Sequence, residues 1–132
     1  MRARATVILK HDGCILLVRE KNGKWLLPGG KIENNELPIS AAIRELYEET
    51  SLIATSIIFL FEHKSFSNFH VVFSATVLET ASIKATNEIT DIQWVRLNDI
   101  SNMDTTPATK KILDMAMENS QSEESKYVSE GS

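Results

Sequence analysis

The sequence predicts a single domain of mixed helix and strand, in the α+β class. Its 132 residues are 42% hydrophobic, which fits one globular domain with a core large enough to be stable alone. Runs rich in β-branched and aromatic residues alternate with turn signals and predict strands. Two segments with helical spacing each begin at a proline, which is common in the first turn of a helix. We expect the domain to cover residues 1–118.

Five apolar runs predict the strands. The first two, ATVIL and CILLVRE, flank the turn residues His11-Asp12-Gly13 and together give a hairpin signal. Asn22-Gly23 marks another turn before WLLPGG. Farther along the chain, IIFLFEH and HVVFSATVLE lie on either side of the mostly polar stretch 64–68, and IQWVRL follows them.

The two predicted helices differ in how their faces are built. The first begins at Pro38, and one narrow face, expected to pack against the core, consists of Ile39, Ile43, Leu46 and Thr50. The second begins at Pro107, and its expected buried side consists of Ile112, Leu113, Ala116 and Met117. Residues 119–132 cannot bury enough apolar surface to offset the cost of ordering, so we expect a disordered tail.

Charge and composition exclude several classes of partner. The net charge of −4 and the pI near 5.4 argue against a nucleic acid polymer as the main partner, although a small anion could bind through a metal or local cations. The N-terminal apolar run is too short for a signal peptide, and no stretch reaches the length of a membrane span. Cys14 is the single cysteine, so no internal disulfide can form. We therefore expect a cytoplasmic protein that does not bind membranes.

The first helix carries an unusual concentration of negative charge. Glu45, Glu48 and Glu49 are related as i, i+3 and i, i+4 and cluster on one face, where each like-charge pair costs roughly 0.2–0.5 kcal/mol. A divalent cation would compensate, because closely spaced carboxylates supply the oxygen ligands that Mg²⁺ prefers. A solvated acidic face, with Arg44 paired to Glu48, would explain the helix pattern equally well.

The glycines before this helix favour the metal-binding interpretation. Pro28-Gly29-Gly30 ends an apolar run and allows the backbone to approach a ligand, because no Cβ stands in the way. The fixed residues that follow have the spacing of the Nudix box, G-x5-E-x7-R-E-U-x-E-E-x-G-U with U a bulky aliphatic: Gly30, Glu36, Arg44-Glu45-Leu46, Glu48-Glu49 and Leu52. The sequence thus resembles the Nudix family, although Ser51 replaces the final glycine.

The resemblance implies a fold and a reaction. The fold would be an α/β/α sandwich, with a mixed β-sheet between helices, and the reaction would be hydrolysis of a nucleoside diphosphate linked to another group. The cofactor would be Mg²⁺, with Mn²⁺ as a substitute. The principal metal ligands would be Glu48 and Glu49, with contributions from the carbonyl of Gly29 and from Glu45.

The resemblance also assigns supporting roles and leaves the general base open. Arg44 would hold Glu45, which is the first candidate for the base, and Glu36 would orient Arg44. Glu88, in the loop before the last strand, is the second candidate, although a solvated loop glutamate is an equally good interpretation. Candidates for substrate binding are Arg19, Trp25 and Lys31, each of which could instead have an ordinary structural or surface role.

Substrate choice is reached by elimination. Relatives that cleave ADP-ribose or diadenosine polyphosphates often carry a proline or a tyrosine some way after the box, where this chain has Ser67, Asn68, Phe69 and His70. A nucleoside triphosphate, cleaved to a monophosphate and pyrophosphate, is the first expectation, and another nucleoside diphosphate derivative such as a nucleotide sugar is the alternative. A Nudix-fold sensor that binds a nucleotide without hydrolysis is the rival from another class. Monomer and homodimer both stay open.

Overall fold

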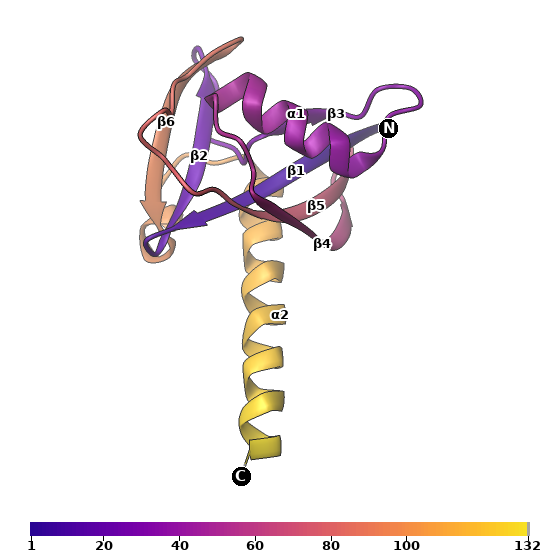
Figure 1. The fold of residues 1–132 in the computed structure, drawn as a ribbon, viewed down its shortest axis with the longest axis vertical. Helices are drawn as coiled ribbons and strands as arrows, with labels where there is room; N and C mark the ends of the chain where they lie inside the picture. Colours follow the sequence, from indigo (N-terminus) through magenta and orange to yellow (C-terminus); the bar gives the residue numbers. More distant parts are fainter. Residues whose placement is uncertain (132) are drawn as a thin grey trace.

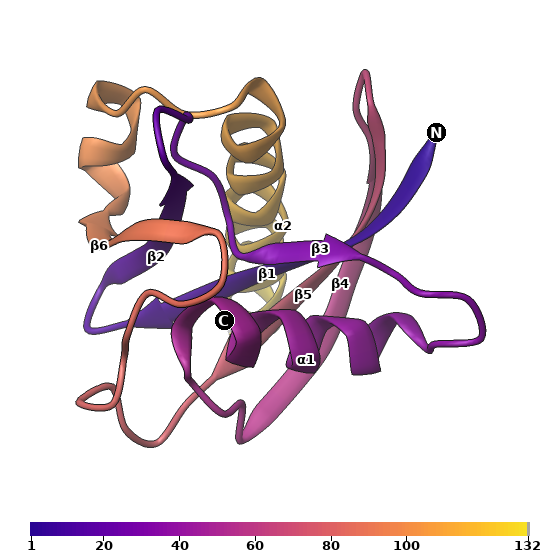
Figure 2. The same ribbon diagram turned by 90° about the horizontal axis from the view of Figure 1, so that it is seen from above.

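The computed structural model describes the backbone of residues 1–131 and the side chains of residues 1–119. A mixed β-sheet forms the middle layer, and the two long helices lie on opposite sides of it (Figure 1; Figure 2). The first core cluster contains residues from α1, and the second contains residues from α2. This arrangement confirms the predicted α/β/α sandwich.

The sheet has six strands, and β1 lies near its centre. The strand order is β4-β5-β1-β2-β6, and β3 also pairs with β1. The β1–β5 pair is parallel, and the other pairs are antiparallel. The bounds are β1 Arg2–His11, β2 Cys14–Glu20, β3 Gly29–Lys31, β4 Ser56–Lys64, β5 Asn68–Thr76 and β6 Ile89–Arg96.

Three helical segments complete the fold. They are α1 (Pro38–Thr50), the 3-10 helix η1 (Leu97–Asn102) and α2 (Pro107–Gly131). In the described part of the chain, no helix combines the length and the apolar character that crossing a membrane requires.

The predicted turns lie where the sequence indicates. Asp12 and Gly13 connect β1 to β2 with φ angles of 50° and 76°, which is the left-handed pair that a tight hairpin of this kind requires. Asn22 is also left-handed, with φ 61°. Asparagine and glycine tolerate this conformation, so both turns are consistent with their local sequence.

The orientation of α1 matches the expected one only in part, since Leu46 and Thr50 are buried as predicted. Ile39 and Ile43, predicted to face the core, are 37% and 40% exposed. The helix instead buries Ala41, Ala42, Glu45, Leu46, Glu49 and Thr50. The two alanines allow a close approach to the sheet. Glu49 accepts a hydrogen bond from Gly29 of β3, and Glu45 accepts one from Arg44 of α1 itself. A wheel weighted by hydrophobicity could not anticipate this orientation, because it assigns carboxylates to solvent.

The ends of α1 are held by its surroundings. Leu37 at the N-cap makes no side-chain cap, and Ser51 ends the helix in the left-handed conformation with φ 65°. The backbone N–H groups of Lys84 and Thr86 donate to the carbonyls of Thr50 and Glu49 at 2.9 and 3.1 Å. The loop before β6 therefore satisfies carbonyls that a helix C-terminus leaves without intrahelical partners.

The second helix follows its hydrophobic pattern near the sheet. Ile112 and Leu113 are buried as predicted, whereas Met117 is 38% exposed. The helix also continues to Gly131, whereas the sequence analysis expects a disordered tail from residue 119. No proline or glycine interrupts the helix between Pro107 and Gly131. Residue 132 of that tail lies outside the described residues. The domain boundary at residue 118 stays a prediction.

Candidate active site

Two carboxylates of α1 point inward, toward the short strand β3. Glu45 and Glu49 are buried, with 9% and 3% exposure, whereas Glu48 is exposed. The backbone N–H of Gly29 donates a 2.8 Å hydrogen bond to Oε1 of Glu49. This contact joins the segment before the helix to the acidic face of the helix.

Each of the two glycines makes room for a different neighbour. A Cβ on Gly29 would lie 2.1 Å from the carbonyl oxygen of Ala5 in β1, and Gly29 has φ 151°. A Cβ on Gly30 would lie 2.4–2.6 Å from the carboxylate atoms of Glu45. Gly29 is therefore required for β3 to approach β1, and Gly30 is required for the Glu45 carboxylate to occupy its position.

Arg44 organises the acidic face. Its Nε and Nη2 donate to the two oxygens of Glu36 at 2.8 and 3.0 Å, in the bidentate geometry that suits a guanidinium and a carboxylate. Its Nη1 donates to Oε1 of Glu45 at 2.9 Å and to Oε2 of Glu48 at 3.2 Å. The Glu36–Arg44 contact agrees with the expectation that Glu36 orients Arg44.

Burial changes the proton affinity of these groups. Desolvation raises the pKa of Glu49 to about 8, although the hydrogen bond from Gly29 and the positive charge of Arg4 act in the opposite direction. Desolvation also raises the pKa of Glu45 against the opposing effect of Arg44. The pKa of Glu36, in contrast, is lowered to about 2 by its hydrogen bond to Arg44. The neighbouring donors and cations of the protein therefore do not fully offset the cost of burying the Glu45 and Glu49 carboxylates.

Each of three carboxylates keeps one oxygen without a protein donor. Glu45, Glu48 and Glu49 accept the bonds described above through a single oxygen each. The second oxygen of each carboxylate accepts no hydrogen bond from the described residues. Every fully buried side-chain oxygen that the structure describes does have a partner, so these three unpartnered oxygens are not fully buried. Hard carboxylate oxygens are the ligands that Mg²⁺ prefers.

The carboxylates fit a divalent cation by donor type, although the described side chains do not already converge on one point. No three His, Cys, Asp or Glu side chains within residues 1–119 form a ready metal-binding group. The carboxylates are held apart by their hydrogen-bond donors, since Arg44 binds Glu45 and Glu48 whereas Gly29 binds Glu49.

The loop candidate Glu88 lies near this acidic face. It is exposed and follows Asn87, which is left-handed with φ 61°. Its negative charge contributes to the raised pKa of Glu49. Lys31 is also exposed, and its carbonyl accepts a 3.1 Å hydrogen bond from Nη2 of Arg44. The charge of Glu88 and the backbone of Lys31 therefore belong to the surroundings of the site.

Arg19 and Trp25, the other two substrate candidates, contact each other. The Arg19 guanidinium lies 4.5 Å from the centroid of the Trp25 ring. Arg19 also donates through Nε and Nη2 to Oδ2 of Asp91, at 3.2 and 3.0 Å, and Trp25 is only 9% exposed. Both side chains thus have structural partners within the chain.

Comparison with known proteins identifies the family. The family model described as the NUDIX domain matches residues 1–115. The chain belongs to the Nudix family. It is 30% identical over 125 residues to the uncharacterized Nudix hydrolase YvcI of Bacillus subtilis, and the match covers 88% of this chain and 78% of that protein. Relatives with this domain are named as hydrolases and diphosphatases, so the chain is a hydrolase by family.

Two further relatives support the assignment. The crystal structure of a Nudix hydrolase family member from Chromobacterium violaceum has a TM-score of 0.80 and 32% identity, covering 89% of this chain and 77% of that chain. An 8-oxo-dGTP diphosphatase of Proteus vulgaris is 37% identical over 57 residues, covering 40% of this chain and 51% of that protein. Nudix hydrolases generally use divalent metal ions, which agrees with the carboxylate donors.

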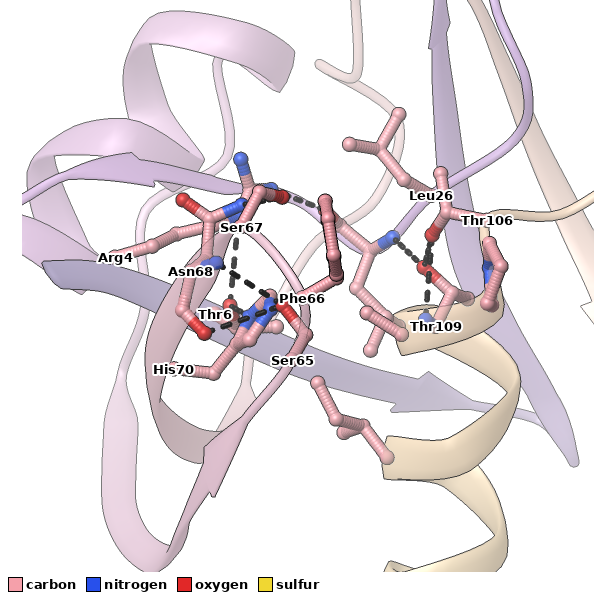
Figure 3. A pocket seen from close by; sticks show the side chains of 14 residues that line it. Arg4, Thr6, Leu26, Ser65, Phe66, Ser67, Asn68, His70, Thr106 and Thr109 are labelled. Carbon is pink, nitrogen blue, oxygen red and sulfur yellow. Dashed lines mark hydrogen bonds between the residues drawn. The ribbon is translucent and has the colours of Figure 1, made fainter. Parts of the chain in front are cut away.

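The Nudix domain also has a cavity that sequence analysis does not predict. It measures about 300 Å³, and Figure 3 shows its polar side chains from β1, from the β4–β5 turn and from the start of α2. Its lining contains Arg4 and no acidic residue. Leu26 and Leu27 also line it, a few residues before the glycines of the acidic site. One segment, 26–30, therefore spans both the cavity and the carboxylates.

Three polar residues of this cavity, Arg4, Thr6 and His70, are missed by the sequence analysis. A signal for the first two exists in the alternation of β1, where Ala5, Val7 and Leu9 belong to one core cluster. Arg4 and Thr6 are two residues apart and lie on the opposite face of the strand. A charged side chain at such a position calls for a partner, and Nη2 of Arg4 donates to the carbonyl of Leu27 at 2.9 Å.

Proposed function

We propose that this protein is a Mg²⁺-dependent Nudix pyrophosphohydrolase that cleaves a nucleoside triphosphate to a nucleoside monophosphate and pyrophosphate. One observation carries the proposal. Glu45, Glu48 and Glu49 each have one carboxylate oxygen fixed by a protein donor and a second oxygen without one, and the carboxylates of Glu49 and Glu45 lie against Gly29 and Gly30 respectively.

The metal would be held by the accessible oxygens of Glu48 and Glu49, with Glu45 and the carbonyl of Gly29 contributing. Mg²⁺ is our first choice and Mn²⁺ a substitute, because both accept oxygen ligands. Once bound, such a cation would supply positive charge for the pyrophosphate oxygens and Lewis acidity for activating water. The raised pKa of Glu49 supports this site, since a nearby cation would favour the ionised carboxylate.

The protein's own residues would orient the reaction. Arg44 is anchored by both oxygens of Glu36 and holds Glu45 at 2.9 Å. This places the Glu45 carboxylate in one orientation, as a general base that accepts the proton of water requires. Glu88 is the second candidate. Its side chain is exposed and lies on a loop, so it has less support from neighbouring groups.

The substrate would extend from the acidic site into the cavity. Its phosphates would lie beside the glycines and carboxylates, where Lys31 supplies a nearby cation, and its nucleoside would occupy the cavity beside Leu26 and Leu27. Arg19 and Trp25 stay candidates for substrate contact, although their contacts with each other favour a structural role. The protein would act in the cytoplasm, as a monomer or a homodimer.

The same site is compatible with two alternative functions. A nucleotide sugar or another nucleoside diphosphate derivative has the same pyrophosphate, so the carboxylates alone do not distinguish it from a triphosphate. A sensor that binds without hydrolysis would not need the fixed Glu36–Arg44–Glu45 arrangement, and this arrangement favours the enzyme.

A panel of nucleotides tests the proposal directly. Purified protein is incubated with Mg²⁺ and with nucleoside triphosphates, nucleotide sugars and other dinucleoside or diphosphate derivatives, and the products are separated by chromatography. We expect a monophosphate and pyrophosphate from at least one triphosphate, with no turnover in chelator. Turnover of nucleotide sugars alone would select the first alternative. Tight binding without turnover of any compound would select the sensor.

A further inference from the structure

The turn between β4 and β5 forms one wall of the cavity and carries a solvent-exposed aromatic ring. Phe66 lines the cavity and is fully exposed, at 103% of its reference surface. Figure 3 shows it between the other turn residues and the side of the cavity formed by Leu26, Thr106 and Thr109. A fully exposed phenylalanine gains nothing from burial in the free protein, so a bound ligand is where its apolar surface would be covered.

A chain of hydrogen bonds connects this turn to the interior. Nε of Arg4 lies 3.3 Å from Oγ1 of Thr6, which lies 2.8 Å from Nδ1 of His70. Nε2 of His70 lies 3.2 Å from Oγ of Ser65, and Ser65 in turn donates to the carbonyl of Asn68 at 3.1 Å.

The chemistry of the groups gives this chain one direction. A guanidinium can only donate, so Thr6 accepts from Arg4. The single hydroxyl proton of Ser65 goes to the carbonyl of Asn68, so Ser65 must accept from Nε2 of His70. Burial and the charge of Arg4 lower the pKa of His70 to about 4, so the ring is neutral. Its one proton therefore lies on Nε2, which leaves Nδ1 to accept from the hydroxyl of Thr6. Nε2 then donates to Ser65, whose hydroxyl proton remains for Asn68.

Ser65 fixes the turn that carries Phe66. Its backbone N–H donates to the carbonyl of Asn68 at 2.8 Å, and its Oγ accepts from the backbone N–H of Asn68 at 3.1 Å. The same hydroxyl receives the proton of His70. A single side chain therefore connects both ends of the turn to the buried Arg4–Thr6–His70 chain, and the orientation of the turn depends on it.

The cavity has the character of a site for a planar, electron-rich group. Its volume of about 300 Å³ lies at the lower end of the range for small-molecule pockets, roughly 300–1,000 Å³. Leu26 and Leu27 supply apolar walls, Arg4 supplies a donor, and no lining residue is acidic. Nucleobases stack on aromatic side chains and present hydrogen-bond acceptors at their edges.

We propose that Phe66 stacks on the base of the bound nucleotide, and that Ser65 and His70 are positioning residues that hold the β4–β5 turn for this contact. The inference rests on the proposed function, because it requires a nucleotide whose phosphates lie at the acidic site. It adds a specificity-determining residue that lies outside the Nudix box.

The test compares Phe66→Ala with the wild type in binding of reaction products. Dissociation constants for the four common nucleoside monophosphates and for ribose 5-phosphate, which has no base, are measured by calorimetry with Mg²⁺. We expect Phe66→Ala to weaken the best monophosphate by about tenfold and to leave ribose 5-phosphate unchanged. Phe59→Ala is the matched control, because Phe59 is also exposed but does not line the cavity. It should bind as the wild type does.

The positioning role has its own variants. Ser65→Ala removes the hydroxyl that joins His70 to the turn, and we expect it to reproduce most of the Phe66→Ala loss. Ser65→Thr keeps the hydroxyl and should restore binding. In kinetic assays both Phe66→Ala and Ser65→Ala should raise KM and reduce the preference among bases, with kcat nearly unchanged, which a general loss of folded protein would not produce.

The outcomes separate this inference from the proposed function. A wild-type protein that neither binds nor hydrolyses any nucleotide overturns the proposed function, and the stacking contact with it. A wild type that binds monophosphates, with Phe66→Ala equal to Phe59→Ala, overturns the stacking contact alone. Equal weakening of ribose 5-phosphate by Phe66→Ala also overturns it, because the lost contact would then not involve the base.

Discussion

The two helices pack against the sheet by opposite rules. In α2 the buried side chains include Ile112 and Leu113, as a hydrophobic pattern predicts. In α1 the buried face includes the carboxylates of Glu45 and Glu49, whereas Ile43 is 40% exposed. Burying apolar side chains stabilises a fold, but burying a carboxylate costs free energy unless a donor or a cation compensates.

The difference between the two buried faces shows that α1 carries a cost in stability at its carboxylates. Gly29 donates to Glu49, and Arg44 donates to Glu45, yet burial still raises the pKa of both carboxyls. The inward face of α1 is therefore incompletely compensated by the protein. Within residues 107–119, the part of α2 whose side chains the structure describes, no carboxylate is buried. Variants on the two helices should accordingly separate activity from stability.

The largest expected effect is on turnover by Glu49→Gln. This change keeps the shape of the side chain and removes a charged metal ligand, so kcat for the best substrate should fall by about 100-fold or more while the protein stays folded. Glu48→Gln should behave similarly. Steady-state kinetics and circular dichroism measure the two effects. Glu62→Gln, an exposed change on β4, is the matched control, and turnover equal to that control would remove Glu49 from the site.

The two candidates for the general base can be ranked by the same assay. Glu45→Gln should lower kcat by roughly 10²–10⁴-fold, as expected for a group that accepts a proton in the transition state. Glu88→Gln should lower it by less than about tenfold, because that side chain is exposed and lies on a loop. Metal affinity is measured in parallel. The reverse order, at unchanged metal affinity, would assign the base to Glu88.

Isoleucine-to-alanine changes compare the helices by stability. Ile112→Ala on α2 removes a fully buried side chain and should cost about 2–5 kcal/mol of unfolding free energy. Ile43→Ala is the same chemical change on the outer side of α1 and should cost less than about 1 kcal/mol. Urea denaturation gives both values. Equal costs would mean that the apolar residues of α1 are buried in solution.

The pH dependence of stability reports directly on the inward carboxylate. The pKa of Glu49 rises from 4.5 to about 8 on folding, so the native state retains a proton that the unfolded state releases. The resulting stability is lost as pH rises toward 8. The pKa of His70 is lowered to about 4 on folding, so its contribution makes stability rise with pH up to ~6.5. Metal-free protein should therefore lose roughly 1 kcal/mol per pH unit between pH ~6.5 and ~8.

Glu49→Gln provides the control for this titration. Glutamine cannot ionise, so the variant should lose the downward slope in the same window. Melting temperatures measured in chelator across the pH range compare the two proteins. A slope that persists in the variant would assign the titration to another group.

The smallest expected effect is at the C-terminal end of α1. Ser51 is left-handed with φ 65°, a conformation that costs a residue with a Cβ roughly 1–2 kcal/mol and glycine almost nothing. Glycine also loosens the unfolded chain, so Ser51→Gly should gain about 0.5–1 kcal/mol net. Thermal unfolding should show a modest rise in Tm, with kcat changed only a few-fold. A lower Tm would contradict the strain at this residue.

Features encoded by local sequence were predictable, and those that depend on tertiary packing were not. The left-handed turn at Asp12-Gly13 and the proline start of both helices follow from short-range chemistry. The Glu36–Arg44 pair was likewise expected from the resemblance to the Nudix family. The orientation of α1 was not predictable from a hydrophobic pattern, because it depends on β3 and on the space left by Gly30.

The cavity was harder to anticipate because its residues come from distant parts of the chain. Arg4, the β4–β5 turn and the start of α2 meet only in the folded structure. His70 is an example, since its two ring nitrogens contact Thr6 and Ser65. No spacing in the sequence encodes that pair of contacts.

Titration of the protein with Mg²⁺ tests the central claim most directly, namely that the inward and adjacent carboxylates of α1 form a metal site. Calorimetry is performed on the wild type, Glu48→Gln, Glu49→Gln and Ile43→Ala, without nucleotide and with a non-hydrolysable triphosphate. We predict that both glutamate variants weaken Mg²⁺ binding by about tenfold or more, whereas Ile43→Ala binds as the wild type does. Equal Mg²⁺ affinity in all four proteins would contradict the account.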